Sequence, residues 1–350
     1  MEVDIARGGI IFLFIACVFF FKRNLEEKAR QVFLGTAFLI LLVLITFRPE
    51  SMVDYNQYEH AFISSNFDIR FEPAFLVIKK ILSWGGASAI CGFFIFALIS
   101  LAARFSSIYK TGTLAVGCLM IYLTNILIIQ DMVAIRAGVA GAFAMLAVQS
   151  KVIHNKRKMY IFLLVALMFH YTSAIFLAIL FMDNKKNRRI FYLSLIFLSY
   201  ILSLRGFYFS TLVERITFLE YIFPLFNSYL LEMQYLDNMM NIFNLVQVFH
   251  VLICIGLWLY VDKIKSIHPD SLLLLKLYTI GVCCIPLFAQ SFNMAIRLSD
   301  LLFSVEVLLL PMGLDAIFSR KSLYYILLVL YSSVFLYIRL TDQLYWESVI

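Results

Sequence analysis

The residues best suited to chemistry are charged or titratable side chains at the edge of, or inside, long apolar runs. Arg136 opens a run rich in alanine and glycine, His170 lies in the middle of another, and Arg297 lies near the start of a third. An arginine offers a planar fork of donors that fits a phosphate or diphosphate. Histidine exchanges protons near neutral pH. Such a set predicts a site for a lipid that carries a diphosphate head group.

Each of these residues also has a purely structural explanation. An arginine at a helix end can extend its charge to the membrane surface, and Asp300 can pair with the arginine one turn before it. His170 can be a buried histidine that bonds Thr172 or Ser173. Glu306 lies deeper in the same late run, where a charge is costly, and it is as consistent with a structural hydrogen bond as with function.

The segment 48–72 is acidic, amide-bearing and aromatic. Asp54 or Glu72 can serve as a general base for a sugar hydroxyl, and Tyr55, Tyr58 and Arg70 can contact the sugar itself. Composition alone favours the alternative, which is an ordinary solvated loop.

Composition predicts the fold class. The 350 residues are 63% hydrophobic, with a mean hydropathy of +0.90, and apolar runs long enough to span a bilayer recur along the chain. We therefore expect an all-α, polytopic membrane protein with one membrane domain over residues 1–350. The net charge of +7 comes from basic residues in short loops, which indicates cytoplasmic anchoring and no nucleic-acid partner. The cysteines lack zinc-ligand spacing, so no metal and no cofactor are expected.

About eleven membrane segments are predicted, and a shorter helix at 73–84, ended by two glycines, is expected to lie at the interface. The predicted segments are 5–21, 31–47, 87–104, 112–129, 133–149, 159–182, 189–204, 242–261, 271–290, 297–314 and 322–338.

The basic residues of the loops predict the orientation. Those of segment 22–30 place the first loop in the cytoplasm and the N-terminus outside. Segment 159–182 has basic clusters on both sides, so it is predicted to enter and return as a broken hairpin with its bend near His170. The outer loops are then about 48–72 and 205–241.

The same orientation predicts on which side of the membrane the charged residues near Arg136 lie. Arg104 is expected inside, and Asp131 and Arg136 are expected at the outer mouth of a helix. The small residues that follow Arg136 favour close helix packing, which would hold its side chain rigidly.

Taken together, these pieces resemble the EpsG-like branch of the bacterial O-antigen and exopolysaccharide polymerases, the Wzy type. The order and spacing of the matching pieces cover about residues 48 to 310, and one departure is Ala137, where the family often has a glutamine. The matching pieces are Asp54-Tyr55-x-x-Tyr58, Glu72-Pro73-x-Phe75, Arg136-x-x-x-Ala140, Phe169-His170-x-x-Ser173-Ala174 and Arg297.

The resemblance implies a GT-C-like, metal-independent glycosyltransferase of the bacterial inner membrane with its active site facing the periplasm. It would transfer a glycan held on undecaprenyl diphosphate to another lipid-linked repeat unit, and a chain-length regulator would be a further partner. Arg136 and Arg297 would hold the diphosphate, His170 would position or protonate it, and Asp54 or Glu72 would be the base.

Two other functions fit the same features. A ligase that transfers the lipid-linked glycan to another acceptor would need the same outer arginines. A flippase or transporter of lipid-linked oligosaccharides would show inverted repeats and charges near the midplane on several helices. No convincing repeat is present in the sequence.

Overall fold

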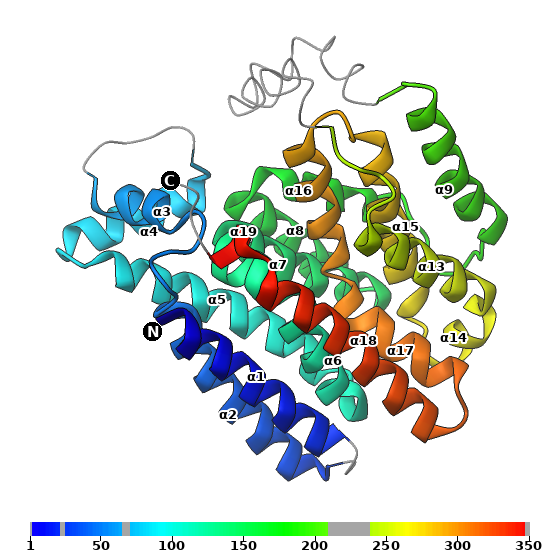
Figure 1. The fold of residues 1–350 in the computed structure, drawn as a ribbon, viewed down its shortest axis with the longest axis horizontal. Helices are drawn as coiled ribbons and strands as arrows, with labels where there is room; N and C mark the ends of the chain where they lie inside the picture. The colour runs from blue at the N-terminus through cyan, green and yellow to red at the C-terminus, as the bar shows by residue number, and fades with distance from the viewer. Residues whose placement is uncertain (1, 22–24, 65–70, 209–238, 347–350) are drawn as a thin grey trace. The chain divides into compact units, whose positions relative to one another are not determined.

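The computed structural model describes residues 2–21, 25–64, 71–208 and 239–346, and every regular element among them is a helix. The chain forms two compact units, of which the first holds Met1–Ser173 with Glu306–Ile350 and the second holds Ala174–Val305. The all-α prediction is confirmed, and Figure 1 shows the helices in chain order. The single membrane domain stays a prediction.

The first unit carries most of the sequence-predicted site. Its helices are α1 Glu2–Phe21, α2 Glu27–Thr46, α3 Tyr55–Ile63, α4 Pro73–Trp84, α5 Ala89–Tyr109, η1 Gly112–Leu114, α6 Ala115–Ile121, η2 Tyr122–Val133, α7 Ile135–Val152, α8 Lys156–Phe169, α17 Glu306–Ile317, α18 Lys321–Thr341 and α19 Gln343–Trp346.

The second unit is built on α15, and η3 Tyr171–Leu180 begins in the first unit and continues into the second. Within the unit α15 packs against α9, α13, α14 and α16. Their bounds are α9 Arg189–Leu204, α13 Leu245–Leu259, α14 Val261–Ile267, α15 Ser271–Leu287 and α16 Phe292–Phe303.

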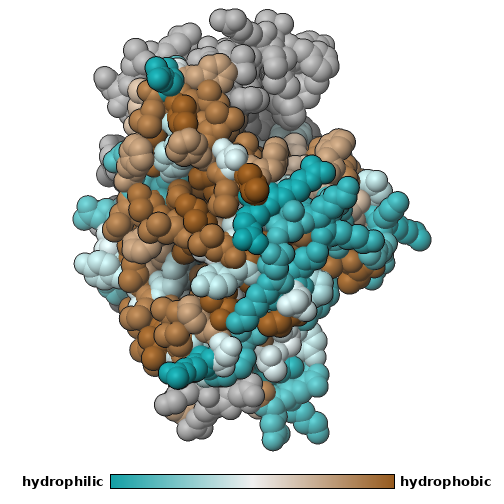
Figure 2. All heavy atoms as spheres, turned by 90° about the vertical axis from the view of Figure 1, so that its right-hand side faces the viewer, coloured by the Kyte–Doolittle hydropathy of each residue, from teal (hydrophilic) through white to brown (hydrophobic). Residues whose placement is uncertain are grey.

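Five described helices are long and apolar enough to cross a membrane, or six if the pair α13 and α14, bent by 73°, counts as one span. The five are α1, α2, α5, the continuous stretch Gly112–Val133, and α18. Large apolar side chains are exposed on the surface, among them Ile190 and Phe197 on α9. On the face drawn in Figure 2, apolar side chains cover a broad area and hydrophilic side chains gather separately. These features identify a membrane-embedded, multi-pass protein, while the total of about eleven segments stays a prediction.

Several predicted boundaries are confirmed and others need correction. The helix at 73–84 ends at Gly85 as expected, with Pro73 in its first turn, where its missing N–H costs nothing. The predicted outer loop 48–72 contains a helix, α3, which its short and mixed sequence did not indicate. The predicted span 297–314 was wrong as one helix, because α16 ends at Phe303 and α17 begins at Glu306. Most of the second predicted outer loop, 205–241, lies outside the described residues.

The predicted break at His170 is present. Helix α8 ends at Phe169, His170 has extended backbone angles of φ −158° and ψ 117°, and the 3₁₀ helix η3 follows. The extended residue turns the chain away from the α8 axis, so the imidazole does not lie on a regular helix face.

Candidate functional site

Glu72 is the centre of the site, and it is completely buried. It occupies the N-cap position of α4 in an extended conformation, yet its carboxylate does not cap that helix. Instead it bonds two residues from distant parts of the chain, Arg136 and His170. Burial alone would raise the pKa of Glu72, but the His170 hydrogen bond and the Arg136 charge lower it to about 2. Glu72 is therefore a fixed anion at neutral pH.

Arg136, in the first turn of α7, forms an ion pair between its Nη1 and Oε2 of Glu72. Its Nε donates to the Tyr58 hydroxyl at 3.3 Å, and its guanidinium lies 4.9 Å from the centre of the Phe71 ring. Among the described residues, Nη2 of Arg136 has no hydrogen-bond partner. The side chain is 12% exposed. The protein thus holds Nε and Nη1 of Arg136, and Nη2 remains available to an incoming anion.

His170 completes the group. Its Nδ1 lies 2.9 Å from Oε1 of Glu72, and the backbone N–H of Tyr171 reaches the same oxygen at 3.4 Å. A carboxylate that accepts from Nδ1 fixes the imidazole tautomer and orientation. The alternative of a histidine bonded at Nδ1 to Thr172 or Ser173 is not what the structure shows. The hydroxyl oxygens of Thr172 and Ser173 are instead buried without a hydrogen-bond partner in the described chain.

An aromatic cluster surrounds these polar groups and keeps them apart from water. Phe75 stacks on Phe71 with ring centres 4.3 Å apart, and Phe96 meets Phe169 edge to face at 5.7 Å. The cluster draws on α3, α4, α5, α7 and α8. In such a low-dielectric setting each charge interaction is stronger than in water, so Glu72 holds Arg136 and His170 firmly in place.

A second buried network lies beneath the start of α7, and the sequence did not reveal it. Arg104 and Asp131 form an ion pair with Nε and Oδ2 3.3 Å apart, and both are fully or almost fully buried. Asp131 also accepts from Ser100 and from Tyr122. Arg104 donates to the carbonyl of Gly138 at 3.1 Å. The network therefore ties α5 and the π-helix η2 to the turn of α7 that carries the site arginine.

Gly138 explains how closely α7 approaches that network. A Cβ at this position would overlap Oδ1 of Asp131 and would lie 2.7 Å from the Gln130 carbonyl oxygen. Only glycine fits there without moving backbone atoms. The small residues after Arg136 thus have the packing role that the sequence predicted, and one of them is fitted to a carboxylate.

These contacts correct two predicted positions. Arg104 was expected as a cytoplasmic charge and Asp131 at an outer helix mouth, but both are buried beside the middle of α5 and are paired with each other. Sequence patterns could not show this, because each charge looks like a helix-end residue when its partner is unknown.

The structure does not gather every predicted site residue. Asp54 precedes α3 in a left-handed conformation with φ 66°, and Tyr55 is buried against Phe93; neither takes part in the contacts that join Glu72, Arg136 and His170. Arg70 lies outside the described residues.

Arg297 belongs to the second unit. It was expected at the start of a helix, and it lies instead in the second turn of α16, whose first residue is Phe292. Glu306, whose role the sequence left open, is buried and accepts hydrogen bonds from Asn125 and Tyr331 in the first unit. Within the described part of the chain no cluster of three or more His, Cys, Asp and Glu residues suits a metal ion.

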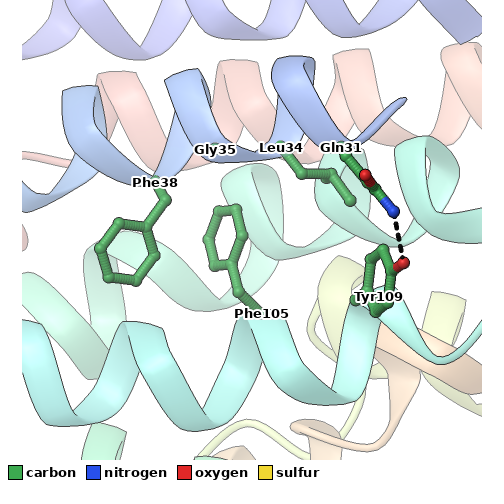
Figure 3. A pocket seen from close by; sticks show the side chains of 6 residues that line it. All are labelled: Gln31, Leu34, Gly35, Phe38, Phe105 and Tyr109. Carbon is green, nitrogen blue, oxygen red and sulfur yellow. Dashed lines mark hydrogen bonds between the residues drawn. The ribbon is translucent and has the colours of Figure 1, made fainter. Parts of the chain in front are cut away.

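The first unit also has a pocket of about 250 Å³ between α2 and α5, away from these residues. Figure 3 shows Phe38, Phe105 and Leu34 lining it, with the Gln31 amide donating to the Tyr109 hydroxyl at 2.8 Å. None of the predicted catalytic or diphosphate-binding residues lines this pocket, so it is not the candidate site.

The arrangement around Glu72 can bind an anion and move a proton. Arg136 supplies a fixed positive charge with one unused arm, and His170 supplies a ring held by a carboxylate. The chain belongs to the EpsG family, whose model matches residues 31–349. Membership suggests a role like that of a polysaccharide polymerase. No curated protein and no solved structure matches the chain.

Proposed function

We propose that this member of the EpsG family polymerises oligosaccharide repeat units carried on undecaprenyl diphosphate. The reaction is a metal-independent glycosyl transfer on the periplasmic face of the bacterial inner membrane, in a GT-C-like fold, and it builds an O-antigen or a related polysaccharide. The observation that supports it best is the joint binding of Arg136 and His170 by the buried carboxylate of Glu72.

In this reaction the bond between the anomeric carbon and the diphosphate oxygen of the donor breaks. The oxygen of an acceptor sugar hydroxyl forms the new bond to that carbon, and the hydroxyl proton must leave. The bonding electrons of the broken bond stay on the diphosphate, which gains negative charge. Fixed positive groups near that oxygen stabilise the transition state.

Arg136 is suited to the leaving diphosphate. Its guanidinium is held by Glu72, by Tyr58 and by the Phe71 ring, so it does not need to reorganise when charge develops. Its available Nη2 can donate to a diphosphate oxygen. We keep the sequence-based proposal that Arg297 is a further ligand of the diphosphate.

His170 is suited to proton transfer, and Glu72 is suited to orienting it. A carboxyl group with a pKa of about 2 is a poor base at neutral pH. We therefore assign the acceptor proton to His170, whose Nδ1 remains bonded to Glu72. Asp54 stays an alternative base from the sequence prediction, although the described contacts do not join it to His170.

The test is a complementation experiment in a strain that lacks the gene. Full-length protein carrying Arg136→Ala, His170→Ala or Arg297→Ala is expressed to equal levels, and the polysaccharide ladder is resolved on a gel. Arg136→Ala and His170→Ala are expected to collapse the ladder to a single repeat unit, because losing a transition-state donor costs about 10²–10³ in rate. Arg189→Ala and His60→Ala are the matched controls. Arg189 is a partly exposed arginine paired with Asp262, and His60 is an exposed histidine on α3.

Other outcomes distinguish the alternative functions. Full ladders from both Arg136→Ala and His170→Ala would refute the proposed site. A deletion strain that polymerises normally but fails to deliver lipid-linked units to the periplasm would identify a transporter. A strain that makes full-length polymer and does not attach it to its final acceptor would identify a ligase.

A further inference from the structure

Arg48, in the loop after α2, is a buried arginine of the first unit that has no carboxylate partner. Its exposed fraction is 4%. Arg104 and Arg136 in the same unit each form an ion pair with a carboxylate, whereas Arg48 forms none with any carboxylate of the described chain. A buried charge without a partner is costly, so the presence of Arg48 at this place needs a reason.

The Arg48 guanidinium leaves most of its hydrogen-bonding capacity unused. Nη1 donates to the carbonyl oxygen of Met132, and the guanidinium carbon lies 4.2 Å from the centre of the Phe93 ring. Nε and Nη2 are buried without a hydrogen-bond partner in the described chain. Native proteins rarely leave buried donors in this state. Nε and Nη2 form one edge of the planar guanidinium, and such an edge can bind two oxygens of a phosphate.

The contacts of Arg48 place it beside the Arg136 site. Met132, whose carbonyl it binds, lies at the end of η2, directly before α7, and the first turn of α7 carries Arg136. Phe93, on which the guanidinium lies, belongs to the aromatic cluster that surrounds the site. The Phe93 ring also packs against Tyr55, with ring centres 5.1 Å apart. Arg48 therefore lies against the same packed core that holds Arg136.

Tyr58 is a neighbour that the two arginines share. Its hydroxyl accepts a hydrogen bond from Nε of Arg136 at 3.3 Å, and it also interacts electrostatically with Arg48. Burial lowers the pKa of Arg48 to about 10, against the opposing influence of Tyr58, Tyr55 and Asp131. Arg48 therefore remains charged at neutral pH. Two positive charges thus lie near one tyrosine, and each keeps donors that no described residue binds.

We propose that Arg48 is a second phosphate-binding residue of the Arg136 site, and that the two arginines together select a lipid-linked diphosphate over a lipid-linked monophosphate. This inference rests on the proposed function and names the residue that makes the site specific. A diphosphate has two phosphoryl groups, so each guanidinium can bind one of them. A monophosphate occupies only one arginine and leaves the other buried charge uncompensated. That difference favours the diphosphate.

The experiment measures thermal unfolding of the full-length protein in detergent against rising concentrations of farnesyl diphosphate and, in parallel, of farnesyl monophosphate. The wild type is expected to bind the diphosphate more tightly. Arg48→Gln should weaken the apparent affinity for the diphosphate about tenfold or more, since a charge-assisted contact is lost. Its affinity for the monophosphate should change little, so the selectivity should disappear. If Arg48 only supported the structure, the variant would weaken both affinities equally.

Two controls accompany this measurement. Arg189→Gln removes an arginine that is already paired with Asp262, and it should keep the selectivity of the wild type. Farnesol has no phosphate and measures the effect of the lipid tail alone. If Arg48→Gln does not fold, Arg48→Lys carries the test. Lysine keeps the charge but lacks the fork, so Arg48→Lys should lose several-fold in selectivity.

The inference and the proposed function can fail separately. The inference is overturned if farnesol stabilises the wild type as well as farnesyl diphosphate does, or if Arg48→Gln keeps the selectivity or loses both affinities equally. If Arg136→Ala and His170→Ala still collapse the polysaccharide ladder in that case, the proposed function stands without Arg48. If Arg48→Gln loses the selectivity while Arg136→Ala and His170→Ala give full ladders, the diphosphate site stands and polymerisation at this site is refuted.

Discussion

Nδ1 of His170 lies 2.9 Å from Oε1 of Glu72, although 98 residues separate them in the chain. The carboxylate also holds Arg136 through its other oxygen. One buried side chain thereby sets the position of both a cation and a titratable ring. Changing it should affect both partners at once, which makes Glu72 the most informative single position in the protein.

Glu72→Gln keeps the size of the side chain but removes its charge. Arg136 then loses its ion pair, and His170 loses the anion that orients it. We expect polymerisation to fall about 10²-fold or more, as when a transition-state donor is misplaced, and stability to fall by about 3–5 kcal/mol, as when a buried pair is broken. Ladder length and thermal unfolding of the same preparations provide the measurement. Glu59→Gln, a change on α3 outside the contact group, should leave both unchanged.

The pH dependence of stability follows from the pKa of Glu72. Its pKa in the folded protein is about 2, below the ordinary value of 4.5. A lowered pKa stabilises the folded protein above pH 4.5, and this contribution is lost as the pH falls from about 4.5 toward 2. Unfolding of the wild type in detergent should therefore show this loss below pH 4.5. Glu72→Gln should lack that component, and an identical acid profile of the two proteins would contradict the assignment.

Gly138→Ala should be destabilising despite the higher helix propensity of alanine. Its Cβ would overlap the Asp131 carboxylate, and relief requires α7 to move away, at a cost of about 1–3 kcal/mol. The site arginine should move with α7, so polymerisation should fall further than the loss of folded protein explains. The matched control is Gly35→Ala on α2, where a Cβ meets nothing within 4 Å. That change should stabilise the protein by up to about 1 kcal/mol. Equal effects at the two glycines would refute the close-packing explanation.

The contribution of the Arg104–Asp131 pair to stability can be tested separately from its role in positioning the site. Asp131→Leu alone leaves a buried guanidinium unpaired and should cost about 3–5 kcal/mol. The double variant Arg104→Met/Asp131→Leu removes both charges and should recover part of that loss. Polymerisation should stay low in the double variant, because the hydrogen bond from Arg104 to the Gly138 carbonyl is gone. Recovery of activity together with stability would show that the network does not position the site.

Tyr331→Phe tests the role of Glu306. The Tyr331 hydroxyl donates to Glu306, and Asn125 donates to both of these residues. Losing the Tyr331 hydroxyl removes one hydrogen-bond donor from the buried Glu306 carboxylate. We therefore expect the free energy of unfolding to fall by about 1–3 kcal/mol. Polymerisation per folded molecule should be unchanged, which would assign Glu306 a structural role. Tyr337→Phe, on the same helix and 70% exposed, should have no effect on unfolding temperature. A selective loss of activity in Tyr331→Phe would instead favour a functional role for Glu306.

Local sequence determined the features that depend on neighbouring residues. Hydrophobic runs and the glycines that end them predicted the helical class and the end of α4, because helix propensity and chain termination act over a few residues. The break at His170 was predicted from the basic clusters on both sides of segment 159–182. Residue chemistry marked Glu72, Arg136 and His170 as site candidates before their positions were known. The ordered motifs also indicated the family, whose model matches residues 31–349.

Only the tertiary structure decided which of these candidates act together. Glu72 contacts Arg136 and His170 because α4, α7 and α8 pack around one aromatic cluster, and no spacing in the sequence encodes that meeting. The pairing of Arg104 with Asp131 likewise turned two apparent helix-end charges into buried partners. Burial and long-range pairing are properties of the packed chain. A charge in an apolar run is costly wherever it lies, and only its three-dimensional neighbours decide what compensates it.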